Sequence, residues 1–257
     1  WQLIGFIHGV MNTDNMSIAG ETIDYGPCAF MDTYHPETVY SSIDHRGRYA
    51  YQNQPPIAHW NLAGLAQALL PLLSENEDEA VEKATAAINT FPECFKASYT
   101  AGLGRKLGLS TVDASDEVLG SDLLERMARN KADFTLTFRY LSALSQTQND
   151  ADNHVRALFE EPAEFDQWAT DWRVRLAQEG VTDSERQDEM RKANPLYIPR
   201  NHLVEAAIRA AEDRDDLASF DHLVTVLTSP YQQQPGAEAY AEPPRPEQVV
   251  QQTFCGT

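Results

Sequence analysis

Apolar side chains recur at three- and four-residue steps from about residue 55 to residue 228 of this chain. This spacing places them on one face of successive α-helices, and such faces are normally buried. Pro55-Pro56 predicts the beginning of the first helix, because the first residues of a helix have no partner within it for their backbone N–H groups. The stripes are Ala58, Leu62, Leu65, Leu69 and Leu72; Val81, Ala84 and Ile88; Leu123, Leu124 and Met127; Phe134, Phe138 and Leu141; Phe165, Trp168, Trp172 and Leu176; Val204, Ala207, Ile208 and Ala211; and Leu217, Phe220, Val224 and Leu227. We predict a mainly helical body with these stripes in its core.

The segments on either side of this body have a different character. Met16 and Ile18 precede Ala19-Gly20-Glu21, and Thr22-Ile23 follows, which predicts two short strands joined by a tight turn. Residues 229–248 contain five prolines and predict an irregular tail. We therefore divide the chain into residues 1–54 with a small β-hairpin corner, a helical part over 55–228, and a proline-rich tail over 229–257.

Charge and cysteine content exclude several classes of partner. Acidic residues outnumber basic ones by 39 to 20, for a formal charge of −19, which repels nucleic-acid phosphates and anionic membranes. The apolar runs are too short to span a bilayer. Cys28, Cys94 and Cys255 are irregularly spaced, so they fit neither a disulfide framework nor a zinc site and indicate a reducing compartment. We expect no nucleic-acid partner and no membrane.

The first 30 residues contain a pattern that is typical of phosphotransfer enzymes. His8-Gly9 precedes Asn15 in the register of the kinase pattern H-G-D-x-x-x-x-N, and Asp24-Tyr25-Gly26 stands where kinases have D-F-G. An amide oxygen and a carboxylate are the hard ligands that Mg²⁺ prefers. The pattern predicts that Asn15 and Asp24 hold a metal beside a nucleotide.

One position of this pattern departs from a kinase. The catalytic aspartate belongs five residues before Asn15, where this chain has Val10, which cannot accept a proton. Asp14 is the nearby carboxylate that could replace it, and His8 is interpreted as a structural anchor that holds the loop through backbone hydrogen bonds. A simpler alternative stays open, in which Asp14 and Asn15 are turn residues and Asp24 begins an ordinary turn.

The stretch HGVMNTDNMSIAGETIDYGP resembles the signature of the selenoprotein O family (SelO, or YdiU in bacteria). The likeness continues through DHRGRYAYQNQPPIAHWNLAGLAQALLPLL, FRYLSAL, NPLYIPRNHLVEAAIRAA and SPY, and so covers essentially the whole chain. The resemblance implies a protein-kinase-like pseudokinase fold that binds ATP in a flipped orientation. The implied activity is protein adenylyltransfer, in which AMP passes to Ser, Thr or Tyr hydroxyls of proteins and pyrophosphate is released.

Matched by motif, the resemblance implies Asp14 as the catalytic base, Asn15 and Asp24 as ligands of Mg²⁺ or Mn²⁺, and Asp24 as a further contact to ATP. The chain begins at Trp1 and is expected to be the C-terminal half, a kinase-like C-lobe with a helical C-terminal extension. An upstream N-terminal lobe is then the expected partner, which supplies the glycine-rich loop and the phosphate-binding lysine, and the chain alone is expected to be inactive. A bacterial member is expected in the cytoplasm and a eukaryotic one in mitochondria.

The resemblance also concerns the C-terminal Cys255, which corresponds to the selenocysteine of eukaryotic members. Some bacterial members pair this cysteine with one in the activation-loop region, where this chain has Tyr40. Cys28 is a possible substitute partner, and the simpler interpretation, a free exposed thiol, stays open. Two other functions stay open, namely phosphotransfer by an atypical kinase and a non-catalytic pseudokinase scaffold.

Overall fold

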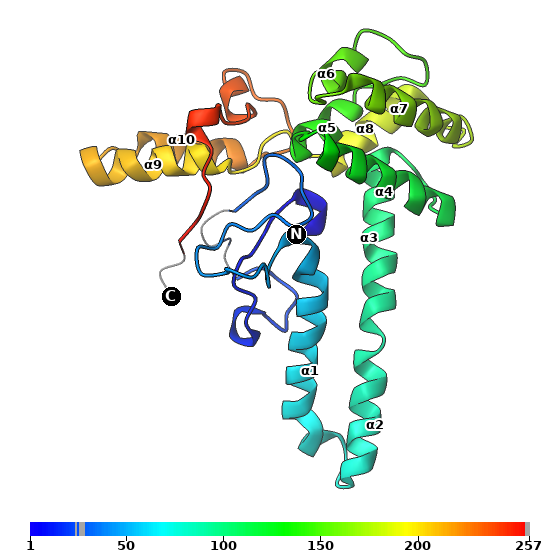
Figure 1. The fold of residues 1–257 in the computed structure, drawn as a ribbon, viewed down its shortest axis with the longest axis vertical. Coiled ribbons are helices and arrows are strands. Elements are labelled where there is room, and N and C mark those ends of the chain that lie inside the picture. Colours follow the sequence, from blue (N-terminus) through cyan, green and yellow to red (C-terminus); the bar gives the residue numbers. More distant parts are fainter. Residues whose placement is uncertain (24, 26–28, 255–257) are drawn as a thin grey trace.

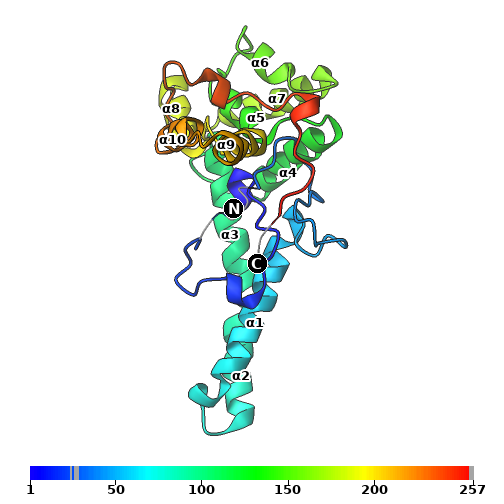
Figure 2. The same ribbon diagram turned by 90° about the vertical axis from the view of Figure 1, so that its left-hand side faces the viewer.

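The computed structural model describes residues 1–23, 25 and 29–254. Most of these residues are helical, as the apolar spacing predicts. The helices are α1 (Gln54–Leu73), α2 (Glu77–Ile88), α3 (Phe91–Leu107), α4 (Ala114–Arg129), α5 (Phe134–Leu141), α6 (Asp152–Arg156), α7 (Pro162–Leu176), α8 (Asp183–Ala193), α9 (Asn201–Arg214) and α10 (Ala218–Leu227). Short 3₁₀ turns occupy Gln2–Ile4, Thr13–Asn15, Tyr51–Asn53, Glu238–Tyr240 and Pro246–Gln248. Figures 1 and 2 show α1 and α2 as an arm that projects from the cluster of α4 to α8, with α3 running from the arm into the cluster.

An aromatic core holds the helical cluster together. Phe165, Trp168 and Trp172 of α7 are completely buried, as their spacing predicts. The two tryptophan rings stack with centroids 5.7 Å apart. Each indole N–H donates a hydrogen bond of 2.9 Å to a backbone carbonyl, one in α4 and one in α3. The rings therefore bury a large apolar area without leaving a polar group unpaired.

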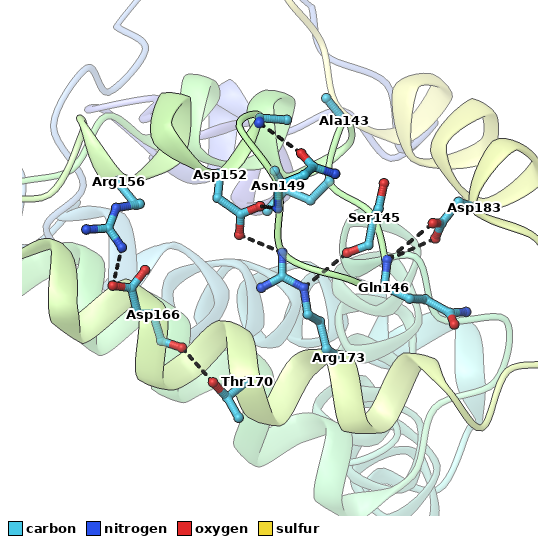
Figure 3. A network of polar contacts seen from close by, with 12 residues as sticks. Ala143, Ser145, Gln146, Asn149, Asp152, Arg156, Asp166, Thr170, Arg173 and Asp183 are labelled. Carbon is cyan, nitrogen blue, oxygen red and sulfur yellow. Dashed lines mark hydrogen bonds and ion pairs between the residues drawn. The ribbon is translucent and has the colours of Figure 1, made fainter.

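Arg173 of α7 fixes the loop that leads into α6 (Figure 3). Its Nη2 donates to Asp152 at 2.5 Å, and its Nε donates to the Ser145 carbonyl at 3.1 Å. The other carboxylate oxygen of Asp152 accepts the Asn149 N–H at 3.0 Å, and Asp152 is only 2% exposed. The ion pair and these additional hydrogen bonds together offset the cost of burying the two charges. They also order the loop before α6, which has no regular secondary structure.

The leucine stripe predicted for the first helix does not face the core. Leu65 and Leu69 of α1 are each 39% exposed and Leu72 is 80% exposed, whereas Gln54 and Asn61 are buried. α1 lies alongside α2 in the arm and meets the N-terminal segment only near its beginning, where the facing groups are polar backbone atoms. The helix therefore buries Gln54, Ile57 and Asn61 and leaves three leucines of the predicted stripe exposed. Among the described residues, no helix combines the length and apolarity that a bilayer span requires.

The sequence also predicts the wrong buried face for the last helix. Leu217, Phe220 and Val224 are about half exposed, while Leu223 and Val226 of α10 are buried. Val226 belongs to a small separate cluster with residues of the 196–241 region, in which the proline-rich tail supplies part of the cover. The tail therefore decides which face of α10 is buried, and helical periodicity alone cannot show where a tail will lie.

The β-hairpin predicted over residues 16–23 is not found in the described part of this segment. A turn does form, with Gly20 N–H donating to the Ser17 carbonyl at 3.2 Å, but the flanking residues are not strands. Ile18 and Ile23 are 89% and 68% exposed, so neither side of such a hairpin would be covered. Strands need a buried face for stability, and here the turn has none.

Lys106 of α3 is a buried cation whose ammonium group lies 4.3 Å from the ring centre of Phe138. Burial lowers the pKa of Lys106 to about 7. The unfolded chain holds this proton up to a pKa of about 10.4, so between these values the unfolded state binds more protons. The contribution of Lys106 to stability therefore rises with pH from about 7 to about 10, and its cost is greatest below pH 7.

Lys106→Met should stabilise the protein at pH 7 by a few kcal/mol, on the order of what a pKa shift of this size implies. Urea unfolding of both proteins between pH 6 and pH 10 measures the effect. We expect the free-energy difference between variant and wild type to shrink as pH rises. A difference that is constant across this range would show that the ammonium charge is not the source of the instability.

Candidate functional site

The described residues on either side of the motif, 5–7 and 29–31, pair with each other and so bring the two ends of the motif segment together. The Ile7 N–H donates to the Ala29 carbonyl at 2.9 Å, and the Met31 N–H donates to the Gly5 carbonyl at 2.8 Å. Phe6 and Phe30 pair between them in an antiparallel bridge, and the side chains of residues 6, 7 and 29–31 belong to the buried core. This pairing, rather than a hairpin within the loop, anchors the motif to the body.

An open cavity of about 430 Å³ lies between the described part of this segment and the start of the chain. It is lined by Trp1, Ile4, His8, Asn15, Met16, Ser17, Gly20, Glu21, Thr22, Ile23 and Tyr25. The Trp1 indole N–H donates to the Thr22 hydroxyl at 2.9 Å, which ties the far side of the loop to the start of the chain. Asp24, Cys28 and Cys255 lie outside the described residues, but both neighbours of Asp24 line this cavity together with Asn15.

Asn15 is held in place by its own loop. Its side-chain Nδ2 donates to the Val10 carbonyl at 2.8 Å, and its backbone N–H donates to the Asn12 carbonyl at 3.1 Å. Because the amide is planar and its nitrogen is engaged, its carbonyl oxygen points away from Val10. That oxygen is a hard donor of the kind that Mg²⁺ or Mn²⁺ accepts, so Asn15 fits the metal that the motif implies.

Asp14 stands one residue away in the 3₁₀ turn Thr13–Asn15, with an exposed side chain. It is not among the residues that line the cavity. A base that receives a proton from a protein hydroxyl must be reachable from outside, and an exposed carboxylate beside the cavity meets that condition. Its role as base stays a prediction. Within the described residues, no group of three or more His, Cys, Asp or Glu side chains is placed to hold a metal ion.

His8 makes hydrogen bonds to the loop of the kind expected of an anchor, and its structural role stays a prediction. Its Nδ1 accepts the Val10 N–H at 3.3 Å, and its backbone N–H donates to the side chain of Gln54 at 2.9 Å. Val10 is thus fixed through its N–H by His8 and through its carbonyl by Asn15. Its apolar side chain leaves the kinase carboxylate position without an acid.

The C-terminal tail reaches the segment that contains Tyr40. The Thr253 N–H donates to the Tyr40 carbonyl at 2.8 Å, and the Ser42 N–H donates to the Thr253 carbonyl at 3.2 Å. Ser41 and Thr253 form a parallel bridge. Burial raises the pKa of Tyr40, so its phenol stays neutral at physiological pH. The tail therefore contacts the segment around Tyr40 through backbone atoms. Cys94, which no motif includes, is a free and exposed thiol.

Sequence reasoning does not single out three residues that contact the motif from outside it. Gln54 and Asn61 of α1 bond to the backbone of residues 6–12, and the Tyr49 hydroxyl donates to the Asn12 side chain at 2.7 Å. One signal was present in the sequence. Gln54 and Asn61 stand seven residues apart, on one face of a helix that contains no charged residue.

The chain belongs to the family described as protein adenylyltransferase SelO, whose model matches residues 1–228. A protein named protein nucleotidyltransferase YdiU from Rhodopseudomonas palustris (strain BisB5) is 59% identical over 257 residues, which are 100% of this chain and 52% of that protein. The protein of the same name from Bradyrhizobium diazoefficiens is 58% identical with the same coverage. A third, from Bradyrhizobium sp. (strain BTAi1), is 56% identical, again over 52% of its length. The chain thus spans about half the length of the curated relatives it matches.

Proposed function

We propose that the natural protein containing this sequence transfers AMP from ATP to Ser, Thr or Tyr hydroxyls of other proteins and releases pyrophosphate. The observation that carries the proposal is the cavity of about 430 Å³, which Asn15 shares with both neighbours of Asp24. Family membership and the names of the relatives support nucleotidyl transfer. The apolar Val10 at the kinase carboxylate position favours this reaction over ordinary phosphorylation.

The proposed roles follow from the chemistry of each side chain. Asp14 accepts the proton of the attacking hydroxyl as its oxygen bonds to the α-phosphorus of ATP. The bond from that phosphorus to the bridging oxygen breaks, and pyrophosphate leaves with the electron pair. Asn15 and Asp24 would hold Mg²⁺ or Mn²⁺, which supplies positive charge next to the phosphates when bound. Asp24 also contacts the nucleotide.

The proposed partner within the protein is an N-terminal lobe, with the helical body as a kinase-like C-lobe and extension. Two observations support this. The relatives are about twice as long as this chain. The uncharged helix α1 exposes Leu65, Leu69 and Leu72, which share one face of the arm and are apolar side chains of the kind that mark an interface. The lobe would add the glycine-rich loop and lysine that complete the nucleotide site.

Intact-protein mass measurement tests the reaction. The full natural polypeptide is incubated with ATP and Mg²⁺ or Mn²⁺, alone and with candidate protein substrates. We expect a mass increase equal to AMP, which disappears when the metal is chelated. An increase equal to a phosphate would show a kinase, and no adduct on any protein would favour the scaffold.

A further inference from the structure

We propose that Asn61 and Gln54 of α1 are positioning residues that hold the backbone of the loop bearing Asp14 and Asn15. The proposal rests on the proposed function, because it assigns these amides a role in the rate of that transfer. Neither side chain belongs to the motif, and neither lies among the groups expected to touch nucleotide or metal.

Asn61 connects the two ends of the short loop that carries Asp14 and Asn15. Its Nδ2 donates to the Met11 carbonyl at 3.0 Å and lies 2.7 Å from the sulfur of Met16. One amide group therefore contacts the residue at which this loop begins and the residue at which it ends. Asn61 is 5% exposed, so water does not compete for these contacts.

Gln54 holds the segment that leads into the loop. Its Nε2 donates to the Phe6 carbonyl at 2.9 Å, and its Oε1 accepts the His8 N–H at 2.9 Å. These are the two backbone groups that a neighbouring strand would pair with, and the side-chain amide pairs with both. Gln54 is 3% exposed. His8 in turn fixes Val10, whose carbonyl holds Asn15.

The arrangement is rigid because both amides come from one helix. Residues 54 and 61 are two turns apart and share a face, so their spacing is set by the helix and not by the loop. The Oδ1 atom of Asn61 is buried without a hydrogen-bond partner among the described residues. An apolar side chain would avoid that cost but would leave the Met11 carbonyl without this donor. A displacement of about 1 Å in a catalytic group can lower a rate by about 10²-fold, which makes this loop sensitive to its support.

The test compares Asn61→Leu with Asn194→Leu in the full natural polypeptide. Asn194 is also buried, its Nδ2 donates to the Lys106 carbonyl and to the Ser142 hydroxyl, and its Oδ1 likewise has no partner among the described residues. It lies away from the motif, so its loss has a comparable structural cost without touching the loop. kcat and KM for ATP are measured below the melting range of every variant and are normalised to the amount of folded protein.

We expect both variants to melt at similarly lowered temperatures, while only Asn61→Leu loses about 10- to 100-fold in kcat with KM for ATP within about twofold of wild type. Gln54→Met should show the same pattern. Equal kcat values in Asn61→Leu, Asn194→Leu and wild type would overturn the positioning role. Failure of the Asn61 and Gln54 variants to fold, although Asn194→Leu folds, would overturn it too, because the two amides would then be structural. A wild-type protein that transfers no AMP would instead count against the proposed function.

Discussion

Replacing Asp24 with alanine in the full natural polypeptide is expected to abolish nucleotide transfer and to weaken metal-dependent ATP binding. The carboxylate is the proposed charged ligand of the metal, and Asn15 alone contributes only a neutral amide oxygen. Without that charge, the metal is held poorly on the phosphates. Transfer rates and ATP binding across a Mg²⁺ or Mn²⁺ titration measure the two effects. Asp78→Ala, which removes an acid from the distant helix α2, is the matched control and should leave both unchanged.

Asp14→Ala should behave differently from Asp24→Ala, because the two carboxylates have different proposed roles. A general base contributes about 10²- to 10⁴-fold to a rate, and its effect appears only during transfer. Turnover should fall by that amount while ATP affinity stays nearly the same. Full AMP transfer by Asp14→Ala would show that another group accepts the proton.

Val10→Asp completes the set, because it restores a carboxylate at the position that kinases use. With ATP in the flipped orientation, this acid would face the wrong phosphate, so phosphate transfer should not appear. A phosphate-sized mass increase on a substrate protein incubated with Val10→Asp would contradict the assignment of Asp14 as the base.

Arg200→Met is expected to destabilise the fold by about 3–5 kcal/mol, the range for breaking a buried ion pair. The guanidinium is fully buried and donates to Asp32 and to Asp133, each at 2.6 Å. It also donates to the Ala241 carbonyl at 3.0 Å. It thereby joins the segment after the motif loop, the start of α5, the start of α9 and the tail. Its loss would leave two carboxylates buried without a cation.

Urea unfolding measures the effect of Arg200→Met, with Arg209→Met as the control. Arg209 bonds to Glu205 and Glu212 on the surface of α9 and is 60% exposed, so its loss should cost less than about 1 kcal/mol. Adding Asp32→Asn and Asp133→Asn to Arg200→Met should recover much of the lost stability, because the cost comes from unpaired charge. A triple variant as unstable as Arg200→Met would show that lost packing matters more.

The interior of the helical cluster was readable from the sequence. The α7 stripe and the Phe134, Phe138 and Leu141 stripe of α5 are buried as predicted, and α5 also buries Thr135, Leu136 and Thr137 outside its stripe. The same reasoning chose the wrong face for α1 and α10. In these helices part of the cover comes from irregular segments, namely the N-terminal segment for α1 and the tail for α10, whose paths leave no periodic signal in the sequence.

The assignment of Asp14, Asn15 and Asp24 to the site comes from the sequence alone and stays a prediction, as does the inference that Val10 removes the usual kinase acid. The way the motif segment is held in place depends on hydrogen bonds between residues that are far apart in the sequence. The tertiary structure alone shows that residues 5–7 pair with residues 29–31 in place of a local hairpin, and that Thr253 reaches Tyr40. It alone shows that Gln54 and Asn61 support the motif loop from α1. Local sequence patterns indicate candidate chemistry and helical periodicity. They do not indicate which carbonyl a buried side-chain amide will bond to, because that pairing is required only after the packed chain has excluded water from both groups.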